Sequence, residues 1–257
     1  MNYGLYLSAT GVLTNLHRQD VIANNLANVE TVGFKRNIAT FQQRLTEAQQ
    51  RGGAENQETD PMLEHIGGGL FCAPTRLDMS QGELERTANN LDVSILGQGF
   101  FAVRDNDQAR LTRDGRFMLD NAGNLIMTNA SASHVLGPDG QPISIPGYVS
   151  TAVEVAKDGT ISAHGQPIGR VGVFNVPDPS QLVKEGGGLL SYPDLSKKMT
   201  PIDANLRNGF VERSNVDPAT ELTTLMEAQR QLEANANMIR YQDQTLGRCV
   251  NDVGKIG

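Results

Sequence analysis

Aromatic side chains are scarce in this chain: tryptophan is absent, and aromatic residues make up only 5% of its 257 residues. Glycine is frequent instead, with 27 residues, and 39% of the sequence is hydrophobic. A chain of this length can form one large domain or two modest ones. The composition therefore predicts many turns and small packing units rather than one heavy core.

Long apolar runs and clusters of positive charge are also lacking. No run of about 18 consecutive apolar residues occurs, so we expect no membrane span. The formal net charge is -7 and the 22 Lys and Arg residues do not cluster, which argues against nucleic acid as a partner because phosphate binding needs a basic patch. The first basic residue is Arg18, so the N-terminus lacks the basic region of a secretory signal. Taken alone, these absences predict a cytoplasmic protein.

Residue types that carry catalysis or bind metals form no recognisable site. Cys72 and Cys249 lie far apart in the sequence, so they form neither a CxxC redox pair nor a zinc site, although a disulfide stays possible. The histidines share no metal-ligand spacing; they are His17, His65, His134 and His164. Gly97-Gln98-Gly99 is followed by Phe100-Phe101, which indicates a turn rather than a dinucleotide-binding loop. We therefore predict no catalytic residue, no cofactor and no metal.

The strongest pattern is a heptad-like seam at the C-terminal end. Its positions alternate between spacings of three and four residues: Leu222, Leu225, Gln229, Leu232, Ala236, Ile239, Asp243, Leu246, Val250 and Val253. We predict a helix that begins with Asp217 as its N-cap, Pro218 as its first residue and Glu221 in its first turn. Residues 222–253 would span about 48 Å as a helix. One small domain cannot cover this length, so the helix needs a partner.

A second amphipathic helix is predicted at the N-terminal end. Its apolar positions also recur every three or four residues, with Gln19 in the one polar gap: Leu5, Ala9, Val12, Leu16, Ala23 and Leu26. Two readings stay open for Asn24, Asn25 and Asn28, which either mark a fraying helix end or form cross-helix hydrogen bonds that fix the register. In the loop that follows, Gly33 can take a positive φ before Phe34 anchors the chain.

Between the helices, the apolar pattern changes to short runs separated by turn residues. Residues 42–75 are rich in Gln, Glu, Asn and Gly, which predicts a flexible linker or loop. Beyond it we predict hairpin-type turns at Asp114-Gly115 and Asp158-Gly159 and a flexible break at Gly186-Gly187-Gly188. The expected fold class is α+β, with long terminal helices forming a coiled-coil-like layer and a central all-β domain of short strands and hairpins. The expected parts are the N-terminal helix with its loop (1–41), the linker (42–75), the β domain (76–205) and the C-terminal coiled-coil helix (206–257).

The two terminal helices can be explained in two ways. Burying the apolar residues of the C-terminal seam contributes roughly 12–16 kcal/mol, whereas ordering its backbone costs about 1–2 kcal/mol per residue. Seam burial alone is therefore insufficient. Either the helices pair within one chain and cap the β domain, or they are poorly ordered in the monomer and fold against other copies. Gln229 and Asp243 then either set the register of a many-helix interface or face solvent.

Several segments resemble one known family. The run 20–29, Asp-Val-Ile-Ala-Asn-Asn-Leu-Ala-Asn-Val, followed by Gly33-Phe34-Lys35-Arg36, resembles the N-terminal signature of the flagellar basal-body rod and hook family. The segments similar to the family's central β region are Gln81-Gly82-Glu83-Leu84, Leu91-Asp92-Val93, Gly97-Gln98-Gly99-Phe100-Phe101 and Thr112-Arg113-Asp114-Gly115. The C-terminal segments similar to it are Ser214-Asn215-Val216, Gln229-Arg230 and Glu233-Ala234-Asn235. The resemblance covers nearly the whole chain in the family's order.

The resemblance implies a non-enzymatic subunit of the bacterial flagellar rod. Such a subunit leaves the cytoplasm through the flagellar type III export apparatus without a cleaved signal, so the resemblance replaces the cytoplasmic prediction with the periplasm-spanning basal body. It polymerises with itself, meets other rod and hook proteins, and transmits torque from motor to hook. The short middle favours a rod subunit, proximal or distal. Two alternatives stay open: a hook or hook-associated axial protein, and a soluble β-domain enzyme or binding module with an intramolecular helical clamp.

The residues expected to carry assembly lie in the two helices and in the loop after the first one. They are Leu5, Val12, Leu16, Asn24, Asn25, Leu26, Asn28, Gly33, Phe34, Leu222, Leu225, Gln229, Leu232, Ile239, Asp243, Leu246 and Val250.

Overall fold

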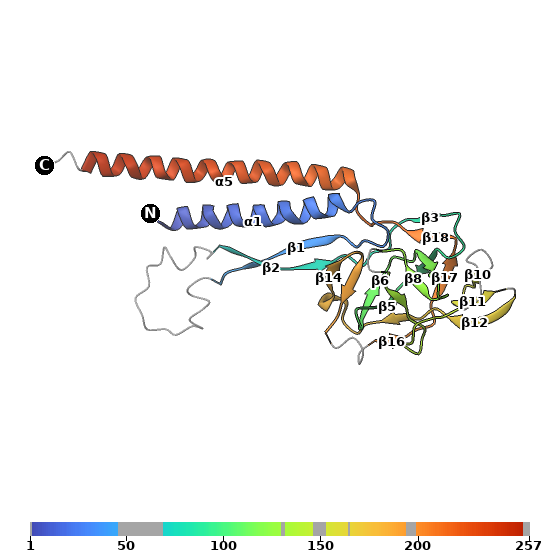
Figure 1. Cartoon of the computed structure of the whole chain (residues 1–257). Coiled ribbons are helices and arrows are strands. Elements are labelled where there is room, and N and C mark those ends of the chain that lie inside the picture. The colour runs from blue at the N-terminus through green and yellow to red at the C-terminus, as the bar shows by residue number, and fades with distance from the viewer. Residues whose placement is uncertain are drawn as a thin grey trace. The chain divides into compact units, whose positions relative to one another are not determined.

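The computed structural model of the chain contains two compact units (Figure 1). It describes residues 2–45, 69–129, 132–145, 153–163, 165–193 and 199–253. The helical unit comprises residues 1–26, 37–76 and 217–257, and the β unit comprises residues 27–36 and 77–216. The helices of both chain ends belong to one unit and small antiparallel sheets form the other, which confirms the predicted α+β fold class.

The helical unit is built from two long helices and a two-stranded ribbon. Its elements are α1 (Asn2–Ala27), β1 (Asn37–Gln43), β2 (Leu70–Leu77) and α5 (Pro218–Val253). In Figure 1, α1 and α5 lie side by side with opposite chain directions, and the ribbon follows the other side of α1. The His17 ring on α1 meets the Phe41 ring on β1 edge-on, with 6.2 Å between their centroids. The helices therefore pair within one chain, with α1 between α5 and the ribbon.

The start of α5 confirms the predicted cap. Pro218 is the first helical residue, where its missing N–H leaves no bond unmade. The Asp217 carboxylate accepts hydrogen bonds from the Thr220 hydroxyl at 2.5 Å and from the Ala219 N–H at 3.2 Å. These bonds, the Thr220 one above all, lower the pKa of the Asp217 carboxyl. Asp217 thus satisfies N–H groups that the first turn leaves unpaired.

Short antiparallel strands build the β unit. They are β3 (Leu84–Arg86), β4 (Val93–Leu96), β5 (Phe100–Asp105), β6 (Gln108–Thr112), β7 (Phe117–Leu119), β8 (Leu125–Met127), β9 (His134–Val135), β10 (Val153–Val155), β11 (Thr160–Ala163), β12 (Gln166–Arg170), β13 (Val173–Asn175), β14 (Val183–Gly186), β15 (Leu189–Ser191), β16 (Thr200–Pro201), β17 (Asn205–Asn208) and β18 (Phe210–Glu212). The largest sheet has the order β14-β15-β6-β5-β9-β8-β7, and β13 joins it through β5 and pairs with β16. Strands β10-β11-β12 form a second sheet, while β17 pairs with β4 and β18 with β3. A single-turn 3-10 helix, η2 (Pro179–Gln181), precedes β14.

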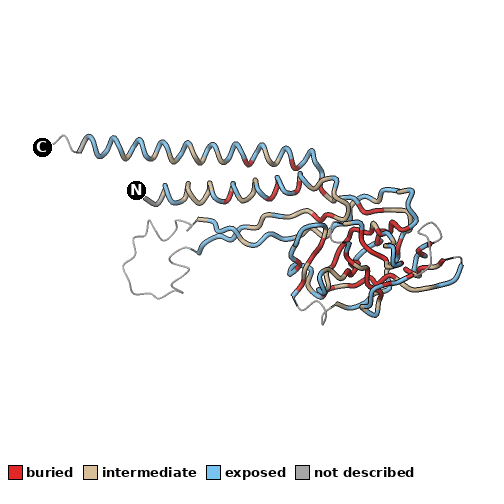
Figure 2. The backbone as a smooth tube through the Cα atoms, in the orientation of Figure 1, coloured by how far each residue is buried: buried red, intermediate tan, exposed pale blue. Residues whose placement is uncertain are grey.

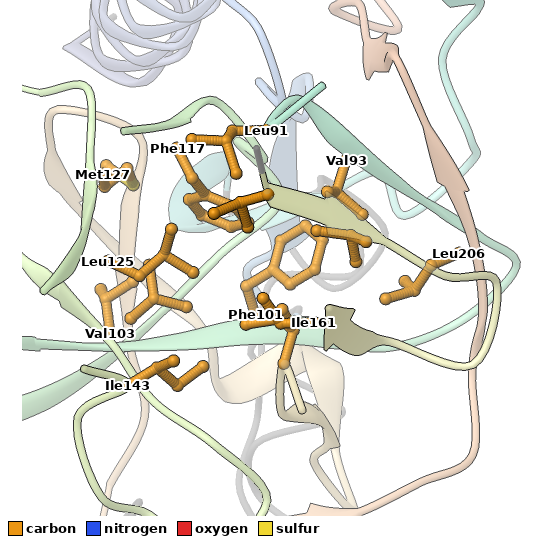
Figure 3. Packing of buried hydrophobic residues seen from close by; sticks show 14 of the residues in the cluster. Leu91, Val93, Phe101, Val103, Phe117, Leu125, Met127, Ile143, Ile161 and Leu206 are labelled. Atoms are coloured by element: carbon orange, nitrogen blue, oxygen red, sulfur yellow. The ribbon is translucent and has the colours of Figure 1, made fainter. Parts of the chain in front are cut away.

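Strand β5 is buried on both faces, which explains its continuous apolar run. Phe101 and Val103 belong to one hydrophobic cluster, and Phe100 and Ala102 belong to another. Successive side chains of a strand point to opposite faces, so each cluster takes alternate residues. Figure 3 shows the first cluster, in which the Phe101 and Phe117 rings meet edge-on with centroids 5.1 Å apart. This core is the predicted all-β centre of the chain.

Two turns differ from the sequence-based expectation. Asp114-Gly115 does not close a hairpin, because β6 pairs with β5 and β15 whereas β7 pairs with β8. Gly115 instead lies against the backbone of Val93, whose N–H donates to the Gly115 carbonyl at 2.9 Å. Gly186-Gly187-Gly188, expected as a flexible break, forms the turn of the β14–β15 hairpin, and its three positive φ angles require glycine. The predicted hairpin at Asp158-Gly159 is present between β10 and β11.

The boundaries of the expected parts also shift. The expected linker 42–75 has its described ends in β1 and β2, and its residues 46–68 lie outside the described part of the chain. The expected helical part 206–257 begins as strands, because β17 and β18 bring Leu206 and Val211 into the interior of the β unit. The β unit thus extends to Val216. Neither described helix has a stretch long and apolar enough to cross a membrane.

Candidate functional site

Exposed and half-buried residues alternate along α5 (Figure 2), and the predicted C-terminal seam contains both kinds. The half-buried positions are Leu225, Leu232, Ala236, Ile239 and Leu246. The exposed positions are Leu222, Gln229, Asp243 and Val250, and the side chain of Val253 lies outside the described part. The most buried residue of α5 is Ala228, at 0% exposure, one position before Gln229. The half-buried Leu225, Leu232, Ile239 and Leu246 recur at seven-residue intervals and form one row of the seam, whereas the other row is open except at Ala236.

The N-terminal seam is also only partly covered. Val12 and Leu26 are half-buried, whereas Leu5 and Leu16 are exposed. Leu13, which does not belong to the predicted seam, is 62% exposed. The buried positions of α1 are Thr14, Val21, Ile22 and Asn25. Large apolar side chains are therefore left uncovered on both helices.

The side chain of Asn25, near the end of α1, fits neither a fraying helix end nor a hydrogen bond to a second helix. Asn25 is buried, and its side chain accepts from the Asn37 N–H and donates to the Asn37 carbonyl, both at 2.9 Å. Asn24 accepts from the Asn37 side-chain amide at 3.3 Å. Asn28 accepts from the Thr31 hydroxyl at 3.2 Å. Asn25 and Asn24 thus attach the start of β1 to α1.

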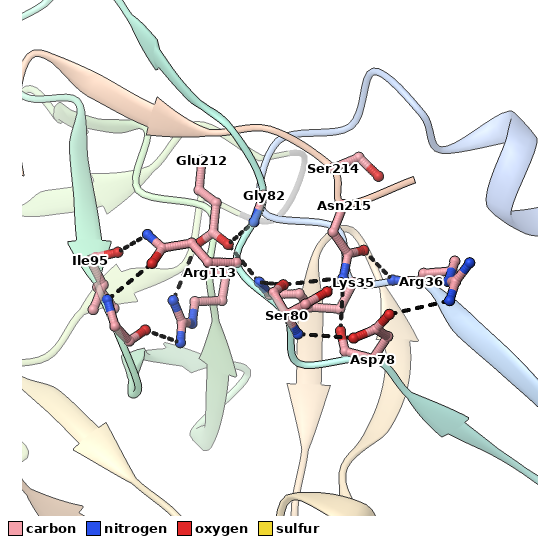
Figure 4. Close-up of polar contacts among 12 residues, drawn as sticks. Lys35, Arg36, Asp78, Ser80, Gly82, Ile95, Arg113, Glu212, Ser214 and Asn215 are labelled. Carbon is pink, nitrogen blue, oxygen red and sulfur yellow. Dashed lines mark hydrogen bonds and ion pairs between the residues drawn. The ribbon is translucent and has the colours of Figure 1, made fainter. Parts of the chain in front are cut away.

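A buried ionic junction, formed by Lys35, Arg113 and Glu212, lies in the β unit (Figure 4). Their side chains are 2%, 5% and 1% exposed, respectively. Glu212 Oε1 accepts from Lys35 Nζ at 2.5 Å, and Glu212 Oε2 accepts from Arg113 Nη1 at 3.1 Å. The backbone N–H of Gly82 also donates to Oε1, at 3.0 Å. One carboxylate at the end of β18 therefore balances two cations from distant parts of the chain.

Asn215 connects the same segments through neutral hydrogen bonds. Its side-chain oxygen accepts from the Arg36 N–H at 2.7 Å, and its side-chain amide donates to the Asp78 carbonyl at 2.9 Å. Arg36 also forms an ion pair with Asp78 at 3.3 Å. A hydrogen bond from the Ser80 N–H lowers the pKa of the Asp78 carboxyl. Residues 35–36, 78–82 and 212–215 are thereby joined at one place.

Gly33 and Phe34 fit tightly into the β unit. Gly33 has a φ of 70°, as predicted, and its N–H donates to the Glu212 carbonyl at 2.7 Å. A Cβ at Gly33 would lie 2.4 Å from the Asp114 backbone nitrogen. The Phe34 ring is buried under Lys184, whose Nζ lies 3.4 Å from the ring centroid. Both residues therefore position the loop inside one unit.

Burial lowers the pKa values of the two cations in the junction. Desolvation lowers the pKa of Lys35, although the Glu212 carboxylate opposes this shift, and the positive charge of Arg113 adds to it. Desolvation likewise lowers the pKa of Arg113, against the effect of Glu212. Because two cations share one anion, Glu212 is the residue on which the junction depends.

Other reactive residues do not gather. Cys72 and Cys249 are both free and exposed. Within the described ranges, no group of three or more His, Cys, Asp or Glu residues could hold a metal ion. The described residues do offer uncovered apolar surface on both helices and a buried polar junction in the β unit.

Three segments of the chain match families of known proteins. Residues 5–35 match "Flagella basal body rod protein", residues 94–163 match "Flagellar hook protein FlgE/F/G D1 domain", and residues 207–253 match "Flagellar basal body rod FlgEFG protein C-terminal". Over 256 residues and the full length of both chains, the sequence is 31% identical to the flagellar basal-body rod protein FlgF of Caulobacter vibrioides. It is 34% identical to the rod protein FlgG of Buchnera aphidicola, covering 94% of this chain and 96% of the relative. FlgG of Bacillus subtilis is 32% identical, with 96% and 97% covered.

This chain belongs to the flagellar basal-body rod protein family. The FlgF/FlgG family is structural and non-enzymatic, so the alternative of an enzyme or binding module is set aside. Membership places the chain in the rod of the flagellar basal body and implies assembly with other rod components.

The matched segments of the rod protein meet in its structure. Lys35 lies in the first matched segment, Arg113 in the second and Glu212 in the third. Their three side chains form the ionic junction. Sequence reasoning identified Gly33 and Phe34 but not these charges. A signal was present: Lys35 and Arg113 stand inside two of the segments that carry the family resemblance.

Proposed function

We propose that this rod protein polymerises through α1 and α5 into the axial drive shaft that transmits torque from motor to hook. The observation that carries the proposal is the apolar surface left open on the helical unit. On α1 the exposed large apolar residues are Leu5, Tyr6, Leu13 and Leu16, and on α5 they are Leu222, Met226, Met238, Tyr241 and Val250. Monomeric soluble proteins rarely leave large apolar patches in water. This surface favours burial against neighbouring subunits.

The two rows of the C-terminal seam have separate tasks in this proposal. The half-buried row, which includes Leu225 and Leu232, packs inside the helical unit of one subunit. The exposed row, which includes Leu222 and Val250, packs against other subunits together with Leu5 and Leu16 of α1. Such a polymer resists twisting because close-packed helix surfaces do not deform continuously.

The route to the rod and the axial neighbours belong to the same proposal. We take the subunit to pass through the flagellar type III export apparatus without a cleaved signal and to contact other rod and hook proteins. Family membership supports the contacts with other axial proteins, since it implies assembly with other rod components.

Leu13→Asp tests the assembly surface. Leu13 is 62% exposed, so we expect the free energy of unfolding of the purified chain to change by no more than about 0.5 kcal/mol. At a subunit interface the same carboxylate would be buried without a partner, which costs several kcal/mol. A strain that carries only this variant should lose swimming in soft agar. Thermal unfolding and immunoblots establish that the variant is folded and present in normal amount.

The matched control is Leu13→Met, which keeps the surface apolar and should preserve swimming. Normal swimming of the Leu13→Asp strain would contradict the proposed surface. Loss of swimming with an unfolded or absent variant would trace the defect to the subunit, in which case Val250→Asp on α5 provides the second test of the same surface.

A further inference from the structure

Two glycines of α1 stand where amide side chains of α5 approach. A Cβ at Gly11 would lie 2.8 Å from Asn235 Nδ2, and a Cβ at Gly4 would lie 2.7 Å from Gln242 Nε2. Gly11 follows Gly4 by seven residues, and Gln242 follows Asn235 by seven residues. Antiparallel helices with heptad packing meet at such matched intervals. The two contacts therefore belong to one continuous register between α1 and α5.

Both glycines and Gln242 carry a cost in stability at these positions. Glycine inside a helix costs about 1 kcal/mol relative to alanine. Gln242 Oε1 is buried and has no hydrogen-bond partner among the described residues, and an unpaired buried acceptor also carries a cost. Polar residues at a helix interface persist where they select one register over others. Because glycines of α1 and an amide of α5 lower stability where they meet, we attribute their presence to the choice of one register.

We infer that the pairs Gly4–Gln242 and Gly11–Asn235 fix the register of α1 against α5. A slip by one helical turn would bring Asn235 to Leu7 or to Asn15, and the side chain there would fill the space that Gly11 leaves open. Gln229 and Asp243 are exposed on α5 and take no part in these pairs within the chain.

The role of this register in assembly rests on the proposed function. The exposed apolar residues of α1 keep the same positions relative to those of α5 in every subunit only when the two helices are held in a fixed alignment. A polymer needs the same surface on every subunit, because each copy must meet its neighbours in the same way. The glycine–amide pairs provide this uniformity within the chain, before any neighbour is bound.

Gly11→Leu in the full-length chain tests the register pairs. Leucine is a better helix former than glycine, so at an open position the change should leave the thermal midpoint unchanged or raise it. At Gly11 the new side chain meets the Asn235 amide, and we expect the thermal midpoint to fall by about 5 °C. The matched control is Gly247→Leu on α5, where no atom lies within 4 Å of a Cβ. Circular dichroism of the purified protein measures the midpoints.

A second substitution that rescues Gly11→Leu distinguishes a defect in the register of α1 against α5 from a general loss of packing. Asn235→Gly opens space on α5, so in the Gly11→Leu background it should recover most of the lost midpoint and restore swimming. Gln229→Gly in the same background changes an exposed residue of the same helix; it should lower the midpoint further, because glycine weakens the helix.

Equal midpoints for Gly11→Leu and Gly247→Leu would overturn the inference, as would failure of Asn235→Gly to rescue. The midpoints are measured on the purified chain and do not depend on the rod, so they test the register even if the proposed polymer is wrong. The predicted midpoints together with full swimming of the Gly11→Leu strain would contradict only the role of the register in assembly.

Discussion

Replacing Glu212 with glutamine should destabilise the β unit by about 3–5 kcal/mol. The substitution keeps the shape of the side chain but removes the one carboxylate that balances Lys35 and Arg113, both of which are almost fully buried. The charge of Arg113 already lowers the pKa of Lys35, so without Glu212 the two cations repel each other in a poorly solvated place. Urea unfolding of the purified full-length chain, followed by circular dichroism, measures the change.

Three comparisons make the Glu212→Gln result specific. Glu185→Gln removes the same charge from an ion pair with Arg110 that is partly exposed, and such pairs contribute at most about 1 kcal/mol. Lys35→Met leaves the ion pair between Arg113 and Glu212 in place, so it should lower the free energy of unfolding by less than Glu212→Gln does. The double variant Lys35→Met/Glu212→Gln should be more stable than Glu212→Gln alone, because one buried cation is gone. Equal losses for Glu212→Gln and Glu185→Gln would refute the role given to the junction.

Gly33→Ala should be the most damaging single-methyl substitution in the loop that follows α1. The φ of 70° costs a residue with a Cβ about 1–2 kcal/mol. The new Cβ would also lie 2.4 Å from the Asp114 nitrogen and 2.5 Å from the Arg113 carbonyl carbon. These are backbone atoms that cannot rotate away, so we expect a total loss of about 3 kcal/mol or more in the free energy of unfolding.

Gly187→Ala is the control for Gly33→Ala. Gly187 has a φ of 59° and no atom within 4 Å of its Cβ position, so this variant should show the conformational cost alone. The difference between the two losses then measures the close approach of Gly33 to residues 113–114. Equal losses in the free energy of unfolding, measured under the same urea conditions, would show that the close approach of Gly33 to residues 113–114 adds nothing to the cost of Gly33→Ala.

The sequence predicts the elements of this rod protein better than it predicts what each residue touches. Asp217 and Pro218 mark the start of α5 because capping depends on local chemistry alone. The strands around Phe101 follow from their short apolar runs, since a buried strand needs no distant information to be apolar. The α+β class follows from the change of period between the chain ends and the middle.

Contacts between distant segments could not be predicted in the same way. A heptad seam shows that Leu222 and Leu225 share a face of a helix, but not that one is exposed while the other is half-buried. That difference depends on which side of α5 meets α1. The ionic junction shows this limit more clearly, because no residue near Glu212 in the sequence indicates that Lys35 and Arg113 will contact it. Asn25 shows the same limit: its pattern left a fraying helix end and a hydrogen bond to another helix open, and its actual partner is the backbone of Asn37.

The most direct test of the central claim is electron microscopy of basal bodies from a strain that lacks this chain. If the protein is a rod subunit that builds the axial shaft, the strain should assemble basal bodies with an incomplete rod and no hook, and the intact gene supplied in trans should restore both. Complete basal bodies with a full rod and hook in the deletion strain would contradict the account.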